Sequence, residues 1–390
     1  MIDPDPILFT IFLIFTGAAA VATGALYARQ ALVVSYILLG FLFGPWGLAL
    51  VTDARVITEI AHIGVIFLLF LLGLNLHPQK LFALLRQTTF VTAVSSGVFA
   101  ISAAVIGWLF GLDPIECIVL GAAFMFSSTI IGLKLLPTMV LHHQRTGEVI
   151  ISVLLLQDLV AIVVLLLVRY LGRGTLPTFD LLLLLLSLPI LVIVAFLGER
   201  YVLRPLMRRF DEIHEYVFLL IIGWCLGIAE LATYLGLSAE VGAFIAGVAV
   251  ATNPISLFIA ETLKPLRDFF LVIFFFALGA SFDLTMLPAV LIPACLLAVL
   301  TLVFKPIVFA ALLRRAGEAD ARAGEVGMRL GQLSEFSLLI AVIAAELGVI
   351  GTTAKHLIQA STLFTFIVSP YVIVLKLPTP ISVTKRLRRD

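Results

Sequence analysis

The chain has 390 residues, of which 62% are hydrophobic and 13% are charged, and its mean hydropathy is +1.19. Soluble domains are far less apolar, so this composition indicates a membrane protein. The formal net charge of +1 gives no sign of a nucleic-acid-binding surface. Long runs without alternation, such as LLLLLLSLPILVIVAFL, exclude a β-barrel. We therefore predict an all-α polytopic membrane protein.

Taken in chain order, the apolar segments predict about 13 transmembrane helices. They lie at residues 6–27, 31–43, 57–75, 88–110, 115–136, 148–171, 178–202, 213–235, 238–252, 256–281, 289–313, 327–347 and 354–376. Two of them, 31–43 and 238–252, are short for a bilayer, so the count can change by one or two.

Basic residues in the connections indicate the orientation. With the N-terminus outside, the inner loops and the C-terminal tail carry 20 Lys and Arg residues, whereas the outer loops carry only Arg55, Arg169, Arg173 and Lys355. Cytoplasmic loops of membrane proteins show this excess of positive charge. We expect an integral protein of the inner (plasma) membrane, with its N-terminus outside and its tail in the cytoplasm.

Two charged residues lie deep in predicted spans. Asp158 occupies the middle of VIISVLLLQDLVAIVVLLLV, residues 149–168. A charge at the bilayer centre costs about 2.5–3.5 kcal/mol on insertion scales, so this acid indicates an ion or proton path. Lys305 is followed by Pro306, which interrupts helical hydrogen bonding. Lys305 either pairs structurally, with Asp158 or a helix C-terminus, or changes its pairing when an ion binds.

The spacing of the spans indicates an inverted repeat. Spans four to six and spans eleven to thirteen are seven spans apart, and an odd offset reverses their orientation. The middle span of each triplet carries polar residues at mid-depth, namely Ser127, Ser128 and Thr129 in the first and Gln332, Ser334 and Glu335 in the second. Each interruption is predicted to be a broken helix whose unwound backbone and half-helix ends coordinate ions.

Both interruptions also have a simpler interpretation. Ser127, Ser128 and Thr129 can allow close helix packing and bond back to their own helix, although matched interruptions in symmetry-related spans beside Asp158 favour a functional role. Glu335 is interpreted as a fixed charge that neutralises a half-helix N-terminus, with direct ion binding as the alternative.

Other classes of protein lack their usual motifs. Cys117, Cys225 and Cys295 are isolated in apolar stretches, so we expect packing residues rather than a disulfide or a metal centre, and no cofactor. The six His residues fall at predicted span ends, and HExxH and GxSxG are absent, which argues against an intramembrane enzyme. A cation channel is the less favoured alternative, because no carbonyl filter such as TVGYG is found.

Seven motifs and Lys305 carry a family resemblance. They are GFLFGPWGL (40–48), IGVIFLLFLLGLNLHPQKL (63–81), FSSTIIGLKLL (126–136), LLLQDLVAI (154–162), LGLSAEVGAFIAGVAVA (235–251), FFFALGASFDL (274–284) and GQLSEFSLL (331–339). Together they resemble the monovalent cation:proton antiporter-2 family, and the Gln-Asp pair is most similar to its Kef-type potassium:proton antiporters.

The resemblance implies a homodimer that exchanges a monovalent cation for H⁺ by an elevator movement, with K⁺ expected and Na⁺ as the alternative. Residues of about 6–75 and 213–281 would form the scaffold, and about 88–171 and 289–376 the ion-carrying core. Asp158 would bind both the cation and the proton. The implied supporting residues are Gln157, Ser127, Ser128 and Thr129 beside the ion, Lys305 as charge partner, and Gln332, Ser334 and Glu335 at the second crossing.

Three features depart from the family pattern. Gln157 stands where sodium-type relatives have a second acid. The stretch after the ninth span reads VATNPISLFIAETLKPLRDF and lacks the acidic regulatory residues of Kef proteins. No GxGxxG follows a strand, so a regulatory nucleotide-binding domain or subunit would lie outside this chain.

Overall fold

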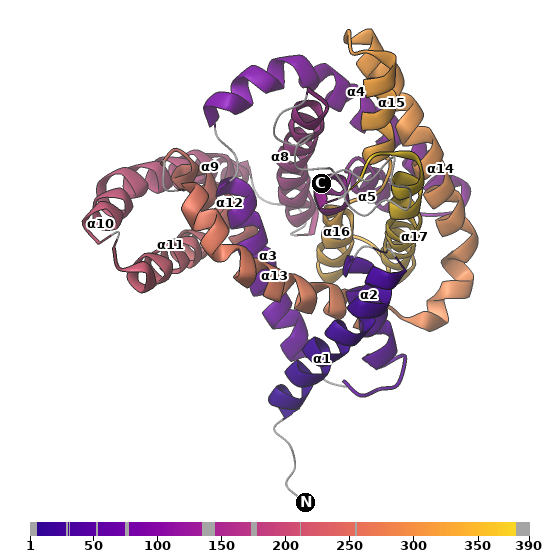
Figure 1. Ribbon diagram of the computed structural model, residues 1–390, viewed down its shortest axis with the longest axis horizontal. Helices are drawn as coiled ribbons and strands as arrows, with labels where there is room; N and C mark the ends of the chain where they lie inside the picture. The colour runs from indigo at the N-terminus through magenta and orange to yellow at the C-terminus, as the bar shows by residue number, and fades with distance from the viewer. Residues whose placement is uncertain are drawn as a thin grey trace, which may run out of the picture. The chain divides into compact units, whose positions relative to one another are not determined.

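A computed structural model describes residues 6–28, 30, 32–51, 54–74, 78–134, 145–172, 178–210, 212–253 and 256–379. The first five residues and the tail after residue 379 lie outside the described residues, and so do the predicted locations of the two termini. Every element in the described ranges is a helix, which agrees with the predicted fold class (Figure 1).

The helices of the first half are α1 (Pro6–Tyr27), α2 (Leu32–Phe43), α3 (Ala54–Leu74), α4 (Pro78–Leu109), α5 (Pro114–Phe124), α6 (Thr129–Lys134) and α8 (Arg145–Gly172). Those of the second half are α9 (Thr178–Gly198), α10 (Arg204–Arg209), α11 (His214–Tyr234), α12 (Ala239–Ala251), α13 (Ser256–Ala280), α14 (Leu287–Arg315), α15 (Asp320–Arg329), α16 (Glu335–Glu346) and α17 (Thr352–Lys376). A π-helical turn, η1 (Glu199–Leu203), joins α9 to α10, and a 3₁₀ turn, η2 (Leu284–Met286), precedes α14.

Each predicted span falls on one of these helices or on one of the adjacent pairs α5/α6, α9/η1 and α15/α16. In the described part of the chain, seven spans are long and apolar enough to cross a membrane: α1, α4, α8, α9 with η1 and α10, α11, η2 with α14, and α17. Shorter apolar helices include α2, α5 and α12. At 13 residues, α12 is about 20 Å long, which explains why its span appeared short in the sequence.

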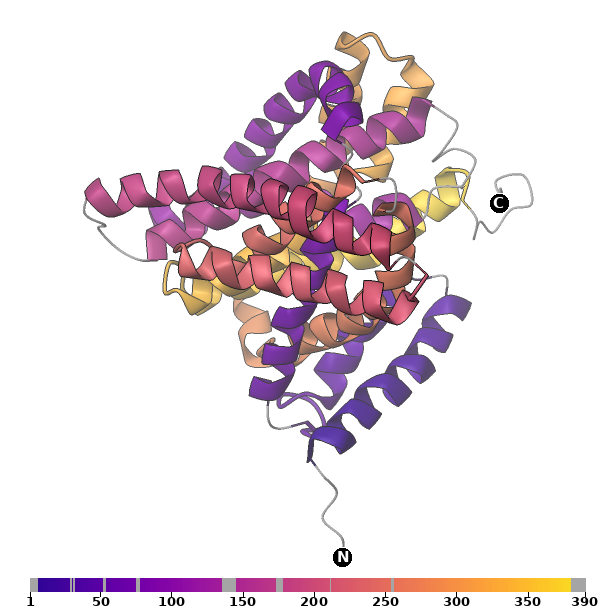
Figure 2. The ribbon, with the colours of Figure 1, turned by 90° about the vertical axis from the view of Figure 1, so that its left-hand side faces the viewer.

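The chain divides into two compact units. Unit 1 comprises Met1–Ala18, Leu39–Phe82 and Gly174–Ser281. In it, α3 packs against α12 and α13, and α11 packs against α12 and runs beside α9 (Figure 2). Unit 2 comprises Ala19–Leu38, Ala83–Arg173 and Phe282–Asp390. In it, α14 packs against α15 and α17, and α16 packs against α5, α8 and α17 (Figure 1).

The packing of unit 1 displays the inverted repeat. A Cβ on Gly247 of α12 would lie 2.1 Å from the Phe70 carbonyl oxygen of α3, and a Cβ on Gly40 of α2 would lie 2.1 Å from the Phe276 carbonyl oxygen of α13. Gly247 follows Gly40 by 207 residues, and Phe276 follows Phe70 by 206. The same close backbone contact, which only glycine permits, therefore occurs twice. The first repeat supplies the glycine in one contact, and the second repeat supplies it in the other.

A cluster of buried apolar side chains holds four helices of unit 2 together. It joins α4, α8, α14 and α15, and its aromatic members Phe99 and Phe309 meet edge to face with ring centroids 5.2 Å apart. Buried apolar contacts of this kind fix the rotation and depth of each helix. They therefore set where the polar residues of α8 and α14 lie.

Candidate functional site

Two helices of unit 2 are broken. Backbone without helical structure separates α5 from α6 at residues 125–128, the first break, and α15 from α16 at residues 330–334, the second break. The predicted pair of broken helices is thus confirmed. The breaks contain Ser127, Ser128, Gln332 and Ser334, and Thr129 and Glu335 begin the half-helices that follow.

The two breaks contact each other directly. The Ser127 hydroxyl donates to the Leu330 carbonyl oxygen at 2.8 Å. The Gln332 Nε2 donates to the Arg329 carbonyl at 2.9 Å and to the Ser128 carbonyl at 3.4 Å. These bonds satisfy carbonyl groups that an unbroken helix would have paired internally. They define the crossing, by which we mean the region where the first and second breaks meet.

Lys305 projects from α14 into the crossing and is almost fully buried. Its Nζ donates to the Phe126 carbonyl at 2.6 Å and to the Gln332 carbonyl at 3.4 Å, and it lies 5.0 Å from the ring centroid of Phe99. Both carbonyls follow the C-terminus of a half-helix, where the helix dipole places partial negative charge. Of the partners that the sequence allows, Lys305 therefore contacts the helix C-termini. The described residues contain no ion pair between Lys305 and Asp158.

Asp158 lies on α8 with 2% of its surface exposed, and its Oδ2 has no hydrogen-bond partner in the described structure. The Thr129 side chain lies beside this carboxylate, close enough to interact with it, but neither its Oγ1 nor the Asp158 Oδ2 makes a hydrogen bond of standard geometry. The buried carboxylate of Glu335 is near enough to interact electrostatically with Asp158, and it accepts a 3.4 Å bond from the Ser334 hydroxyl. Buried polar atoms are rarely left unpaired, so two together indicate a place for a ligand.

Gln157, the neighbour of Asp158, uses both ends of its amide on the first break. Its Oε1 accepts from the Ser127 backbone N–H at 3.0 Å, and its Nε2 donates to the Met125 carbonyl at 3.0 Å. The Ser128 hydroxyl accepts from the Ile131 N–H at 3.2 Å, as a helix cap does. Gln157, Ser127 and Ser128 thus lie where the sequence placed them, but their side chains are engaged with protein groups.

The second break is held from α17. Thr365 Oγ1 accepts from the Leu333 N–H at 3.2 Å, and the Ser369 hydroxyl donates to the Gln332 Oε1 at 3.1 Å. Ser334 caps α16. Thr365 and Ser369 are not among the predicted site residues, because a hydroxyl in an apolar span normally bonds to its own helix. Their spacing of four residues, which puts them on one face of α17, was the only available signal.

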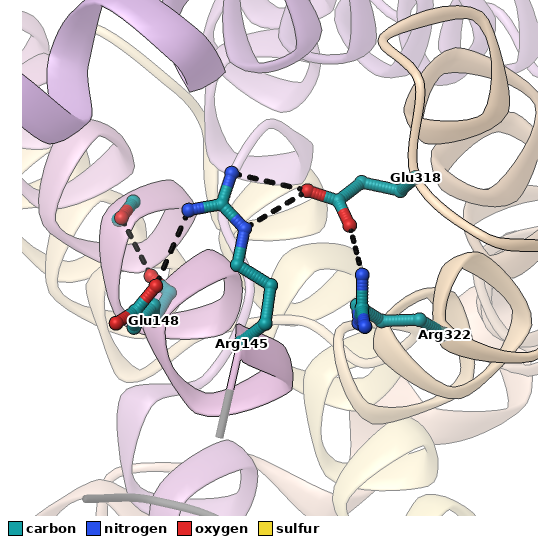
Figure 3. Close-up of polar contacts among 5 residues, drawn as sticks. Arg145, Glu148, Glu318 and Arg322 are labelled. Carbon is teal, nitrogen blue, oxygen red and sulfur yellow. Dashed lines mark hydrogen bonds and ion pairs between the residues drawn. The ribbon is translucent and has the colours of Figure 1, made fainter. Parts of the chain in front are cut away.

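A cluster of charges fixes the start of the helix that carries Asp158. Arg145 bridges Glu148 and Glu318 through contacts of 3.2 Å, and the other oxygen of Glu318 accepts from Arg322 at 2.6 Å (Figure 3). Glu318 lies in the loop between α14 and α15. The cluster therefore ties the first turn of α8 to the segment that leads into the second broken helix.

A buried acid beside two crossed broken helices, in a chain of apolar spans, is the arrangement expected of a secondary membrane transporter. Residues 11–375 match the family model of the transmembrane sodium/hydrogen exchangers, and the chain belongs to this family.

Relatives and solved structures extend over nearly the whole chain. The "Iron transporter MagA" of Paramagnetospirillum magneticum is 27% identical over 360 residues, which cover 90% of this chain and 82% of that protein. A structure of the sodium proton antiporter MjNhaP1 from Methanocaldococcus jannaschii at pH 8 superimposes with a TM-score of 0.70 and 17% identity, covering 93% of this chain and 95% of the other. A second structure of MjNhaP1, from electron microscopy, gives a TM-score of 0.66, 18% identity and coverage of 93% and 94%.

Proposed function

We propose that this protein is a secondary active transporter that exchanges a monovalent cation, K⁺ in the first instance, for H⁺. The observation that carries the proposal is the pair of unpartnered, adjacent oxygens of Asp158 and Thr129 at the crossing. Oxygen ligands suit hard cations, which exchange their hydration shell for such groups. Membership of the sodium/hydrogen exchanger family supports the same activity.

In the proposed cycle, ionised Asp158 binds the cation together with the Thr129 hydroxyl. A proton that binds the same carboxylate removes its charge, so the cation leaves. The cation and the proton therefore exclude each other from Asp158, and this competition couples the two fluxes. Lys305 keeps its charge against the two half-helix ends and holds the crossing while the load on Asp158 changes.

We assign the scaffold to unit 1 and the moving, ion-carrying core to unit 2, in a homodimer with an elevator-type movement. Support comes from the division of the chain, because unit 2 contains both broken helices, Asp158 and Lys305. The charge bias of the loops supports an inner-membrane protein with its N-terminus outside. The Gln157-Asp158 pair supports a Kef-type K⁺ exchanger over a Na⁺ exchanger, and any regulatory nucleotide-binding domain would be a separate or additional segment.

Iron transport is a second candidate, because a relative that covers 90% of the chain is described as an iron transporter. A soft or borderline metal prefers His and Cys ligands. Among the described residues, no group of three or more His, Cys, Asp and Glu side chains is placed to hold a metal ion. We therefore regard Fe²⁺ as a less favoured substrate than the alkali cations and include it in the test.

The test is proton movement in proteoliposomes that contain a pH-sensitive dye. Gradients of K⁺, Na⁺, Rb⁺, Li⁺ and Fe²⁺ are imposed one at a time, and K⁺ is expected to drive the largest proton flux. Asp158→Asn should remain folded and lose cation-driven flux. The matched control is Glu230→Gln, which neutralises an exposed acid of α11 and should transport normally. Normal exchange by Asp158→Asn, or flux driven by Fe²⁺ alone, would refute the proposal.

A further inference from the structure

We infer that Gln157 is a positioning residue for the first break and does not contribute a ligand to the transported cation. The inference builds on the proposed function, because it specifies which groups at the site meet the cation. Gln157 is 1% exposed and belongs to the same helix as Asp158.

The geometry requires an amide at this position. The side chain must donate to the Met125 carbonyl and accept from the Ser127 N–H, both at 3.0 Å. An amide has one donor and one acceptor group, whereas an ionised carboxylate has acceptors only. An acid at position 157 would therefore satisfy the Ser127 N–H and leave the Met125 carbonyl unpaired.

The second repeat holds its break in a comparable way. Thr365 and Ser369 of α17 bond the Leu333 N–H and the Gln332 side chain. In each triplet, then, the last helix uses polar side chains to hold the break of the preceding helix. Since α17 does this with hydroxyls and no acid, holding a break is separable from binding an ion.

Adjacent residues of α8 thus divide two tasks. Their side chains diverge by about 100° around the helix. Gln157 uses its polar atoms on the first break, and Asp158 keeps its Oδ2 free beside the unpartnered Thr129 hydroxyl. The cation then meets Asp158 and Thr129, and Gln157 acts only by keeping Thr129 in place at the start of α6.

The variant Gln157→Glu separates positioning from ligation through the pH profile of transport. When the introduced carboxyl group is protonated, it regains a donor for the Met125 carbonyl and keeps an acceptor for the Ser127 N–H, so exchange should survive at acidic pH. The ionised side chain loses the donor, and the maximal rate at alkaline pH should fall by about tenfold relative to the unaltered protein, the effect of one lost buried hydrogen bond. The KM for the cation should change little. A lower KM at alkaline pH, where the added negative charge would attract a cation that it touches, overturns the inference.

Hydrogen exchange of the Ser127 amide gives a readout that does not depend on transport. Gln157→Ala, and also the shorter Gln157→Asn if the alanine variant does not fold, should speed exchange in peptides that cover residues 125–128. The matched control is Gln359→Ala, because Gln359 is also buried in unit 2 but its amide has no hydrogen-bond partner among the described residues. It should leave exchange at the first break unchanged.

Two failures can be told apart. If Gln157→Ala and Gln157→Asn exchange at the first break like the unaltered protein, Gln157 does not position it, whatever the transport assays show. If the unaltered protein moves no protons in response to cation gradients, the proposed function fails, and a faster exchange in Gln157→Ala still establishes the positioning role.

Discussion

Lys305→Met tests which groups the buried ammonium of Lys305 interacts with. Methionine has nearly the volume of lysine but no charge and no donor. The change removes a charge-assisted bond of 2.6 Å to the Phe126 carbonyl, a weaker one of 3.4 Å to the Gln332 carbonyl and a contact with the Phe99 ring. A hydrogen bond to a charged group contributes about 1.5–3 kcal/mol, and a desolvated cation–π contact about 1–2 kcal/mol. Removing a buried charge recovers part of this, so we expect a net loss of about 2–4 kcal/mol.

The assay is the thermal unfolding midpoint of the purified protein in detergent, at neutral and at acidic pH. Since the partners of Lys305 are carbonyls, which do not titrate, the loss should be similar at both. The matched control is Lys264→Met. Lys264 is half exposed and lies 3.5 Å from Glu261, so this change should cost less than about 0.5 kcal/mol.

A strong pH dependence of the loss would contradict this assignment of partners. If Lys305→Met destabilises strongly at neutral pH and hardly at all where Asp158 is protonated, then Lys305 pairs with Asp158 and the carbonyl contacts are secondary. A loss as small as that of Lys264→Met at both pH values would show that the crossing does not need the charge.

Three further predictions concern the charge carried, the site and the packing. An imposed membrane potential should not change the ion gradients at which net exchange stops, because Asp158 carries no net charge when either a cation or a proton is bound to it. A shift of this equilibrium point would mean that a second charge moves across the membrane. Thr129→Val should raise the KM for the cation with a smaller effect on the maximal rate, whereas an unchanged KM excludes Thr129 as a ligand. Gly247→Ala places a Cβ 2.1 Å from the Phe70 carbonyl and should lower stability by about 1–3 kcal/mol. Gly227→Ala, with nothing within 4 Å, should be neutral or stabilising by up to about 1 kcal/mol, and equal midpoints for the two variants would contradict this account.

The sequence alone determined the helical class, the spans and the two broken helices. In lipid, every backbone polar group must be paired within the protein, so long apolar runs without alternation indicate helices. Polar and charged residues at mid-depth are costly there, so they indicate a functional site. The first break lies at the serines of FSSTIIG and the second at GQLSE, as the pattern predicted. Asp158 stood out for the same reason, as a charge in a run where it is costly.

The hydrogen-bond partner of each polar residue follows from the tertiary structure and could not be predicted from the sequence. Lys305 contacts carbonyls of both breaks, Gln157 uses its amide on the backbone of residues 125–127, and Thr365 and Ser369 hold a break from a helix that reads as apolar. Sequence spacing gives the face of a helix but neither its rotation nor its depth relative to its neighbours. Those are set by close packing of side chains, and a shift of one helix by a few ångströms exchanges one hydrogen-bond partner for another.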